Sequence, residues 1–311
     1  MKSTRNLTIA AMAALIVPAP AAQGQCPDGA SRFAHTGYCH ETPDPCLLPS
    51  DCDPGVNCDL NYFWNEPENW SDGVPDIGVD ACIENGESAY TVNFNAAAKS
   101  LYIDSTSEMK VGVYSNGFAL TLGDNSTIDG ALHLYQNTTL YINKSLTIGG
   151  SGRVMGHASQ SEIAMIKAVG GAAYTLTLGS GVQLDTEWDV YVPLVNNGAV
   201  KARKLSNNLG RIKLIEGGSG SGDWIAELGG TLIVDGTVTG SGDWKLVNSA
   251  SSTIQIDAAC IGLTGDVTIS AGTLDVNRNF CTTGNLTFSG DAIDVASAYK
   301  AKFDVATCTE N

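Results

Sequence analysis

Short pairs of aliphatic residues, separated by one polar or aromatic residue, recur along the chain from about residue 90 to residue 295. Leu101-Tyr102-Ile103, Leu120-Thr121-Leu122 and Leu140-Tyr141-Ile142 are three examples. A period of two places both aliphatic side chains on one face of an extended strand. Gly, Asn, Asp, Ser and Thr flank the triplets and leave no room for a helix. The pattern therefore predicts an all-β protein of very short strands, each with one buried face.

Two internal repeats set a longer period. The pentapeptide Gly220–Trp224 recurs as Gly240–Trp244, an offset of 20, and Thr264–Ser270 returns in related form as Thr283–Ser289, an offset of 19. A propeller blade is about twice as long, and a sandwich requires no constant period. We therefore expect a right-handed parallel β-helix, a β-solenoid with coils of about 19–22 residues and two or three strands per coil. Residues 90–295 would then form about eleven coils and a rod about 50 Å long.

Composition changes near residue 80. Nine of the ten prolines lie at or before Pro75, and most of the cysteines also fall in this early part. Proline cannot donate to a strand ladder, and so short a segment cannot build its own core. We expect a small cysteine-rich module at 25–62, an N-terminal cap at 63–89, the solenoid at 90–295 and a C-terminal cap at 296–311.

Cysteine usage predicts disulfides, because thiols at this density in an oxidising compartment pair up. The nine candidates are Cys26, Cys39, Cys46, Cys52, Cys58, Cys82, Cys260, Cys281 and Cys308. Six early cysteines allow 15 connectivities, so their pairing stays open. Cys308 could join Cys281 or Cys260 and close the C-terminal cap. The early spacings lack the paired C-x2-C pattern of a structural zinc site.

A polar run in the cysteine-rich module offers a weak calcium motif. Its oxygen ligands would be Asp51, Asp53, Asn57 and Asp59, because a hard cation prefers several oxygens from one turn. Pro54 interrupts the spacing of a calcium loop, and a polar loop bounded by disulfides is the alternative. No other cofactor is expected.

The N-terminus has the layout of a secretory signal peptide over residues 1–24. Lys2 and Arg5 precede an apolar run from Leu7 to Val17 and a stretch of small residues. The apolar run is too short to span a bilayer, so we expect an exported protein, extracellular or on the cell surface, with no transmembrane segment after cleavage. The formal net charge of −16 argues against nucleic acid or an anionic membrane as partner.

Three acidic residues are the best candidates for a site in the solenoid. Asp185, Glu187 and Asp189 alternate along a strand-like run and would share one face, with Thr186 and Trp188 on the other. Such acids could contact a glycan or a cation, although a solvated strand face has the same pattern. The four histidines are scattered, with no pair at helical spacing, so no zinc hydrolase is indicated.

The segment before the solenoid contains Trp64, Asn69-Trp70, Gly73 and Pro75, followed by Ala81, Ile83 and Tyr90. It resembles the start of secreted bacterial parallel β-helix proteins, the group that includes autotransporter passengers and haemagglutinin-like adhesins. The resemblance implies a surface location and adhesion. Trp64 and Trp70 are expected to form the core of the cap, with a sugar-stacking platform as the alternative.

Two functions remain open on the sequence. The first is a secreted or cell-surface structural or adhesive solenoid without catalytic activity, which binds an extracellular surface, a polysaccharide or another copy of itself. The second is an extracellular protein that binds or cleaves a polysaccharide, as a lyase or glycosidase does. Function is argued from sites and not from folds, and the sequence shows no clear catalytic constellation.

Overall fold

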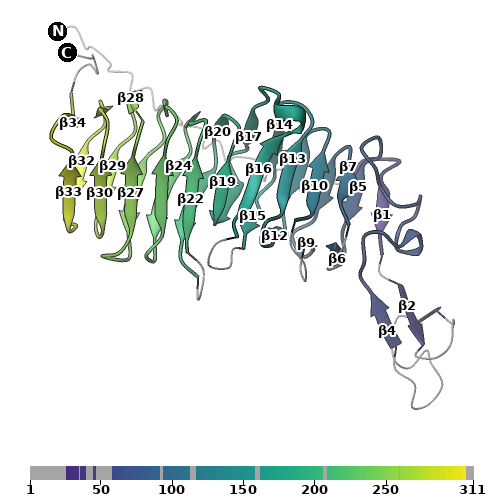
Figure 1. The fold of residues 1–311 in the computed structure, drawn as a ribbon. Coiled ribbons are helices and arrows are strands. Elements are labelled where there is room, and N and C mark those ends of the chain that lie inside the picture. The colour runs from purple at the N-terminus through teal and green to yellow at the C-terminus, as the bar shows by residue number, and fades with distance from the viewer. Residues whose placement is uncertain are drawn as a thin grey trace, which may run out of the picture.

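The protein is an elongated, all-β parallel β-solenoid of about nine turns with almost no helix (Figure 1). The computed structural model describes residues 26–34, 36–39, 45–46, 58–91, 94–112, 117–157, 162–205, 209–258 and 260–305. The fold class predicted from the hydrophobic period is confirmed. The expected signal peptide lies outside the described residues.

Most turns contribute one strand to each of three faces. Face 1 comprises β1 (Ser31–Phe33), β5 (Ala81–Ile83), β8 (Leu101–Ile103), β11 (Ser126–Ile128), β14 (Leu146–Gly149), β17 (Leu176–Leu178), β20 (Leu194–Asn196) and β23 (Gly218–Ser219). Isolated bridges then lead to a second sheet on this side, with β28 (Cys260–Leu263), β31 (Phe280–Thr282) and β34 (Ala301–Lys302).

Faces 2 and 3 hold ten strands each. Face 2 comprises β6 (Ser88–Thr91), β9 (Glu108–Val111), β12 (Ala131–Leu134), β15 (Arg153–Gly156), β18 (Gln183–Thr186), β21 (Ala199–Arg203), β24 (Asp223–Glu227), β26 (Trp244–Val247), β29 (Val267–Ile269) and β32 (Leu286–Phe288). Face 3 comprises β7 (Ala96–Ala98), β10 (Ala119–Leu122), β13 (Thr139–Ile142), β16 (Ala164–Ala168), β19 (Trp188–Val190), β22 (Arg211–Leu214), β25 (Thr231–Val234), β27 (Thr253–Ile256), β30 (Thr273–Val276) and β33 (Ala292–Val295).

The length of a turn varies more than the sequence repeats indicate. In register, Ser88 pairs with Glu108, an offset of 20, whereas Arg153 pairs with Gln183, an offset of 30. Gln183 in its turn pairs with Ala199, an offset of only 16. The repeats that set the period lie in the C-terminal half, and longer turns precede them. The expected eleven coils are therefore too many, and the protein makes about nine turns.

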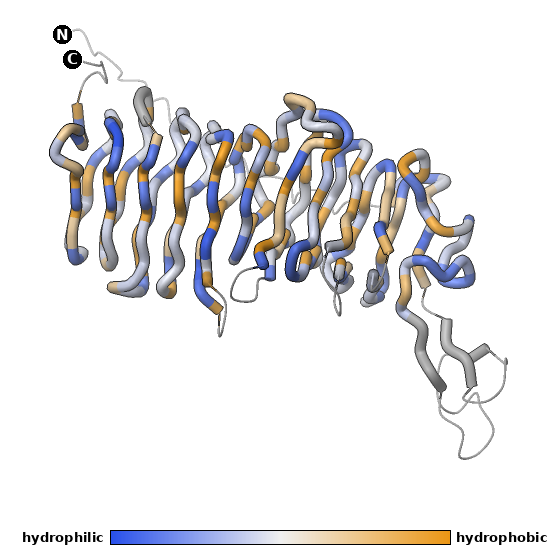
Figure 2. The backbone as a smooth tube through the Cα atoms, in the orientation of Figure 1, coloured by the Kyte–Doolittle hydropathy of each residue, from blue (hydrophilic) through white to orange (hydrophobic). Residues whose placement is uncertain are grey.

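Aliphatic residues form continuous rows inside the rod. On face 3, Leu120 pairs with Leu140 and Leu140 with Ile166, and all three side chains are fully buried. Hydrophobic and hydrophilic positions alternate along the strands in Figure 2, as one-sided burial requires. Each such side chain contributes about 1.5–3 kcal/mol through removal from water. These rows therefore hold the turns together and fix which side chains point outward.

The N-terminal end of the rod is covered. Trp64 and Trp70 are buried there with ring centroids 4.6 Å apart, and the Trp70 indole N–H donates to the Trp64 carbonyl at 2.7 Å. The strand β1, from the cysteine-rich part of the sequence, pairs with β5, and Cys26 forms a disulfide with Cys82. β5 in its turn pairs in parallel with β8, so face 1 continues from β1 into the rod. Both indoles thus belong to the cap interior and offer no open face to a sugar.

A small antiparallel sheet projects from this end of the rod (Figure 1). It contains β2 (Thr36–Cys39), β3 (Pro45–Cys46) and β4 (Cys58–Asn61). The only helical segments described are the 3-10 turns η2 (Pro67–Asn69) and η3 (Val169–Gly171). Neither of these short helices could cross a membrane.

Candidate functional site

The three candidate acids lie at a bend and not on one open strand face. Thr186, at the end of β18, has a φ of 73°, which turns the backbone before β19 begins. Asp185 and Glu187 are fully buried, and Asp189 is partly exposed. The expected shared acidic face is therefore not formed, because the strand ends between the first acid and the other two.

Each of these acids has a structural partner. The Asp185 carboxylate receives two hydrogen bonds from Arg203, one of them from Nε at 2.5 Å. Burial raises the pKa of Asp185, and Arg203 opposes this rise. Glu187 accepts a hydrogen bond from the Gly210 backbone N–H, and Asp189 pairs with Arg211 Nη2 at 2.7 Å. The acids thus hold the bend against the following turn.

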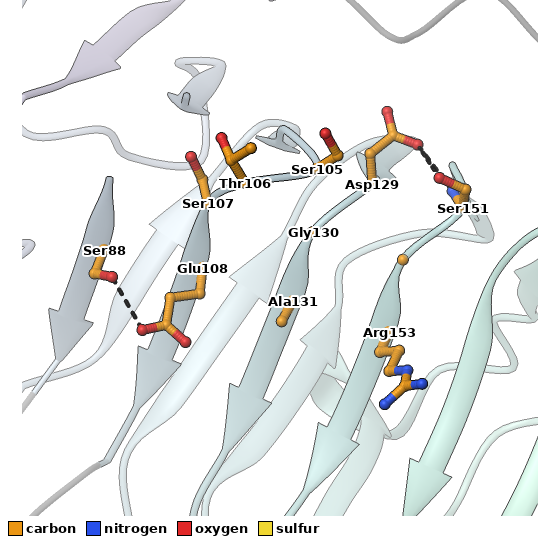
Figure 3. Close-up of a pocket in the computed structure, with 11 residues that line it drawn as sticks. Ser88, Ser105, Thr106, Ser107, Glu108, Asp129, Gly130, Ala131, Ser151 and Arg153 are labelled. Atoms are coloured by element: carbon orange, nitrogen blue, oxygen red, sulfur yellow. Dashed lines mark hydrogen bonds between the residues drawn. The ribbon is translucent and has the colours of Figure 1, made fainter. Parts of the chain in front are cut away.

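A polar hollow lies where face 1 passes into face 2. We call it the polar groove; it has a volume of about 410 Å³, and its lining residues come from four successive turns, those of β6, β9, β12 and β15 (Figure 3). Eight of its eleven lining residues carry a hydroxyl, carboxylate or guanidinium group, and the other three are small; the lining is Ser88, Ser105, Thr106, Ser107, Glu108, Asp129, Gly130, Ala131, Ser151, Gly152 and Arg153.

The strand register produces the hollow. Glu108, Ala131 and Arg153 occupy equivalent positions on β9, β12 and β15, so their side chains stand in one row. Neighbouring strands are about 4.8 Å apart, and the short Ala131 side chain leaves a gap between its two long neighbours. At the corner, a Cβ on Gly130 would lie 2.1 Å from the Ser107 carbonyl oxygen. The groove depends on small residues in its floor.

A series of titratable groups in close contact begins at the groove. Glu108 accepts from Ser88 Oγ at 3.0 Å and from Lys110, and its Oε2 lies 3.6 Å from His133 Nε2. His133 Nδ1 is 2.8 Å from His157 Nε2. The His157 ring also stacks on Tyr135, with centroids 4.7 Å apart. Figure 3 shows the start of this series, where Ser88 and Glu108 meet at one side of the groove.

The protonation states of this series follow from burial and neighbours. Burial alone would raise the pKa of Glu108, but hydrogen bonds from Lys110 and Ser88 lower it overall. Burial lowers the pKa of His133, and burial together with His133 lowers the pKa of His157 to about 4. At neutral pH Glu108 is therefore ionised and both imidazoles are neutral.

This arrangement suits recognition of a ligand rich in hydroxyl groups. Glu108 and Asp129 accept hydrogen bonds, the Arg153 guanidinium donates them, and the serine and threonine hydroxyls do both. Proton donation to a leaving group would need a carboxyl with a raised pKa, whereas the pKa of Glu108 is lowered. The lowered pKa keeps the Glu108 carboxyl ionised at neutral pH, where it accepts hydrogen bonds and does not donate a proton.

One group of three metal-type ligands occurs in the described part of the protein. It consists of Cys26, Cys82 and Glu84, and the two cysteines are joined in a disulfide, so they offer no thiolate to a metal. Of the predicted calcium ligands, Asp51, Asp53 and Asn57 lie outside the described residues. Only the backbone of Asp59 is described, as part of β4.

Cys281 in β31 is also disulfide-bonded. Cys308, its candidate partner, lies outside the described residues, as does Cys52. The cysteines at 39, 46, 58 and 260 are described only as backbone within strands. The predicted disulfide framework thus stays a prediction apart from the Cys26–Cys82 pair and the participation of Cys281 in a disulfide.

The histidine pair was not predicted from the sequence. His133 and His157 stand 24 positions apart in the sequence, which is close to one turn, and the structure brings their rings to a centroid distance of 5.1 Å. A search for polar residues separated by one turn would have found them. The polar groove was also missed, because its corner residues belong to three turns of unequal length.

No family model, no curated protein and no solved structure matches this sequence.

Proposed function

We propose that the protein is an exported, extracellular β-solenoid that binds a polysaccharide through the polar groove and serves as a structural or adhesive module without cleaving it. The observation that carries this proposal is the row Glu108, Ala131 and Arg153, which opens a hollow lined by hydroxyl and charged groups from four successive turns. Surface attachment through a bound glycan is the form that adhesion would take.

The chemistry of the groove favours a saccharide over other polymers. A glycan offers donor and acceptor hydroxyls at short, regular intervals, and the groove offers both kinds of partner along the rod axis. The net charge of −16 opposes the phosphate backbone of nucleic acid. The polar lining contains no aromatic or aliphatic anchor of the kind that binds an apolar partner.

Export is supported by sequence and by cysteine chemistry. Residues 1–24 have the pattern of a signal peptide, and disulfides such as Cys26–Cys82 persist in oxidising compartments. The resemblance of the cap segment to secreted β-helix adhesins points the same way. Peptide mapping of the secreted protein would locate the mature N-terminus, and a cytosolic, uncleaved protein would contradict export.

The groove is tested by filling it. Ala131→Trp should weaken binding to an immobilised polysaccharide panel at least about tenfold, because the indole occupies the space between Glu108 and Arg153. Ala199→Trp is the matched control, since Ala199 stands at an equivalent position on β21 and lies outside the groove lining. Unchanged binding by the Ala131 variant would refute the groove as the site.

Cleavage of the bound polysaccharide is the second candidate function, and product analysis distinguishes it from binding alone. Glu108 beside His133 is the observation that favours it, because an ionised carboxylate and a neutral imidazole can both accept protons. We expect no new reducing ends and no unsaturated products after prolonged incubation with the bound polysaccharide. Products that disappear in Glu108→Gln would show that the protein is an enzyme.

A further inference from the structure

A second hollow lies on face 3, away from the polar groove. We call it the tyrosine pocket; it has a volume of about 340 Å³ and is lined by Tyr141, Lys167, Ala168, Gly170, Gly171, Ala172 and Tyr191. Two phenol rings, one ammonium group and a glycine-containing turn therefore meet on the outside of the rod. No contact described so far gives this combination a role in the fold.

The strand register explains how the two rings flank the ammonium. Tyr141 on β13 pairs with Lys167 on β16, and the Tyr191 backbone N–H, just after β19, donates to the Ile166 carbonyl at 2.9 Å. The three side chains thus stand in one row, with Lys167 in the middle and ~4.8 Å between neighbouring strands. Lys167 Nζ lies 4.8 Å from the centroid of the Tyr191 ring.

Lys167 differs from several other lysines of the rod in the group that its ammonium contacts. Lys99, Lys110, Lys144, Lys213 and Lys245 each form an ion pair with a carboxylate. Among the described residues, Lys167 has no carboxylate partner and contacts an aromatic face. Acidic residues outnumber basic ones by 33 to 17 in this protein and repel an anion at long range, so binding of an external anion here depends on this local cation and on short-range contacts.

The pocket also exposes apolar surface that a solvated strand face does not require. Tyr191 is 41% exposed, and Val169, beside the pocket in η3, is 38% exposed. Gly170 and Gly171 have φ of 65° and 72°, and this left-handed backbone shapes the turn that forms one wall. Exposed aromatic surface next to a cation is typical of a ligand site.

We propose that the tyrosine pocket binds an acidic sugar unit, such as a hexuronate residue of a polysaccharide. The C–H groups of the sugar ring pack against the faces of Tyr141 and Tyr191, and the sugar carboxylate pairs with the Lys167 ammonium. The inference shares the ligand class of the proposed function but depends on different residues on a different face. It therefore stands even where the polar groove binds nothing.

The test uses the full-length secreted protein with Ala131→Trp in every variant, so that the polar groove makes no contribution. The probes are oligogalacturonate and the same oligosaccharide after reduction of its carboxyl groups to alcohols, measured by titration calorimetry. We expect oligogalacturonate to bind at least about tenfold more tightly than its reduced form, because only the acid pairs with Lys167.

Three substitutions separate the contribution of the tyrosine ring from that of the Lys167 ammonium. Tyr191→Ala should weaken oligogalacturonate binding about tenfold, whereas Tyr191→Phe, which keeps the ring, should stay within about twofold of the parent protein. Lys167→Gln should abolish the preference for the acidic probe and leave the reduced probe unaffected.

The results that would overturn the tyrosine pocket as a binding site differ from those that would overturn the polar groove. No binding of oligogalacturonate by the parent protein, equal binding of both probes, or full affinity in Tyr191→Ala would each overturn the tyrosine pocket as an acidic-sugar site. By contrast, the single Ala131→Trp variant could bind polysaccharide normally and lose this binding when Tyr191→Ala is added. That result would overturn the polar groove as the binding site and support the tyrosine pocket.

Discussion

The ion pair between Asp185 and Arg203 is unusual because it is buried on the outward side of a strand. The Asp185 side chain is fully buried and that of Arg203 is 15% exposed. Removing a carboxylate from water costs several kcal/mol, which a partner only offsets when both hydrogen bonds form. This pair therefore fixes the bend after β18 and adds little net stability.

Single and double substitutions at this pair should behave very differently. Arg203→Met should lower the free energy of unfolding by about 3–5 kcal/mol, since it leaves the buried Asp185 carboxylate without its partner. Adding Asp185→Leu should restore most of that loss. Denaturant unfolding of the three proteins measures both effects, and a double variant as unstable as the single one would contradict the argument.

The neutral histidine pair makes stability depend on pH. The folded pKa of His157, about 4, lies below its ordinary value of 6.5, so the unfolded state binds more protons between these values. Stability is therefore complete above about pH 6.5 and falls toward pH 4, by at most roughly 3 kcal/mol. His157→Phe, which keeps the stack on Tyr135, should show a smaller fall over this range. Identical pH profiles for the two proteins would show that His157 is not held neutral.

At the scale of the element, the corners are more constrained than the strands. Gly240 has a φ of 116°, and a Cβ placed on it would lie 2.2 Å from the Gly220 carbonyl oxygen. The Ser241 N–H donates to that same carbonyl at 3.0 Å, so the two corners stack directly. The Gly-Ser-Gly parts of the two repeated segments are therefore corners, and the Asp-Trp parts lead into strands β24 and β26.

Two glycine substitutions distinguish the free-energy cost of backbone strain from that of a steric clash between stacked turns. Gly240→Ala should cost about 3 kcal/mol or more, because backbone strain and a clash with the previous turn add. Gly86→Ala should cost only about 1–2 kcal/mol, since Gly86 has a φ of 81° but nothing within 4 Å of the added Cβ. Comparable losses in chemical denaturation would mean that the corners are not tightly stacked.

At the scale of the whole molecule, the sequence predicts the fold far better than the sites. The rows of buried aliphatic side chains inside the rod depend on a local period of two, which the segment Leu120-Thr121-Leu122 already displays. The fold class can therefore be predicted from short segments. The polar groove and the tyrosine pocket, on the outer surface, depend on which turns are neighbours and on the register in which their strands pair. The long turn that ends at Gln183 and the short turn that follows it shift that register. The meeting of Lys167 with Tyr191 therefore does not follow from a period of 20.

A whole turn should be removable where the register is regular. Trp224 pairs with Trp244, so deletion of residues 224–243 joins equivalent positions and should leave a folded rod with one turn fewer. The dependence of unfolding free energy on denaturant should fall by about one-ninth. Deletion of residues 224–233 alone, which removes half a turn, should unfold the turns beyond the cut. Equal circular dichroism spectra from both deletions would contradict a turn-by-turn architecture.

The positions of the indole side chains divide the rod into two optically separate regions. All five tryptophans are buried: Trp64 and Trp70 in the N-terminal cap, and Trp188, Trp224 and Trp244 in later turns. The rings of Trp224 and Trp244 stack at 5.8 Å, close enough for their excited states to couple. Loss of their exciton signal in circular dichroism would report opening of the later turns, and a red shift in tryptophan emission that precedes this loss would report opening that starts at the cap. The direction in which the solenoid unzips is thus readable without any added label.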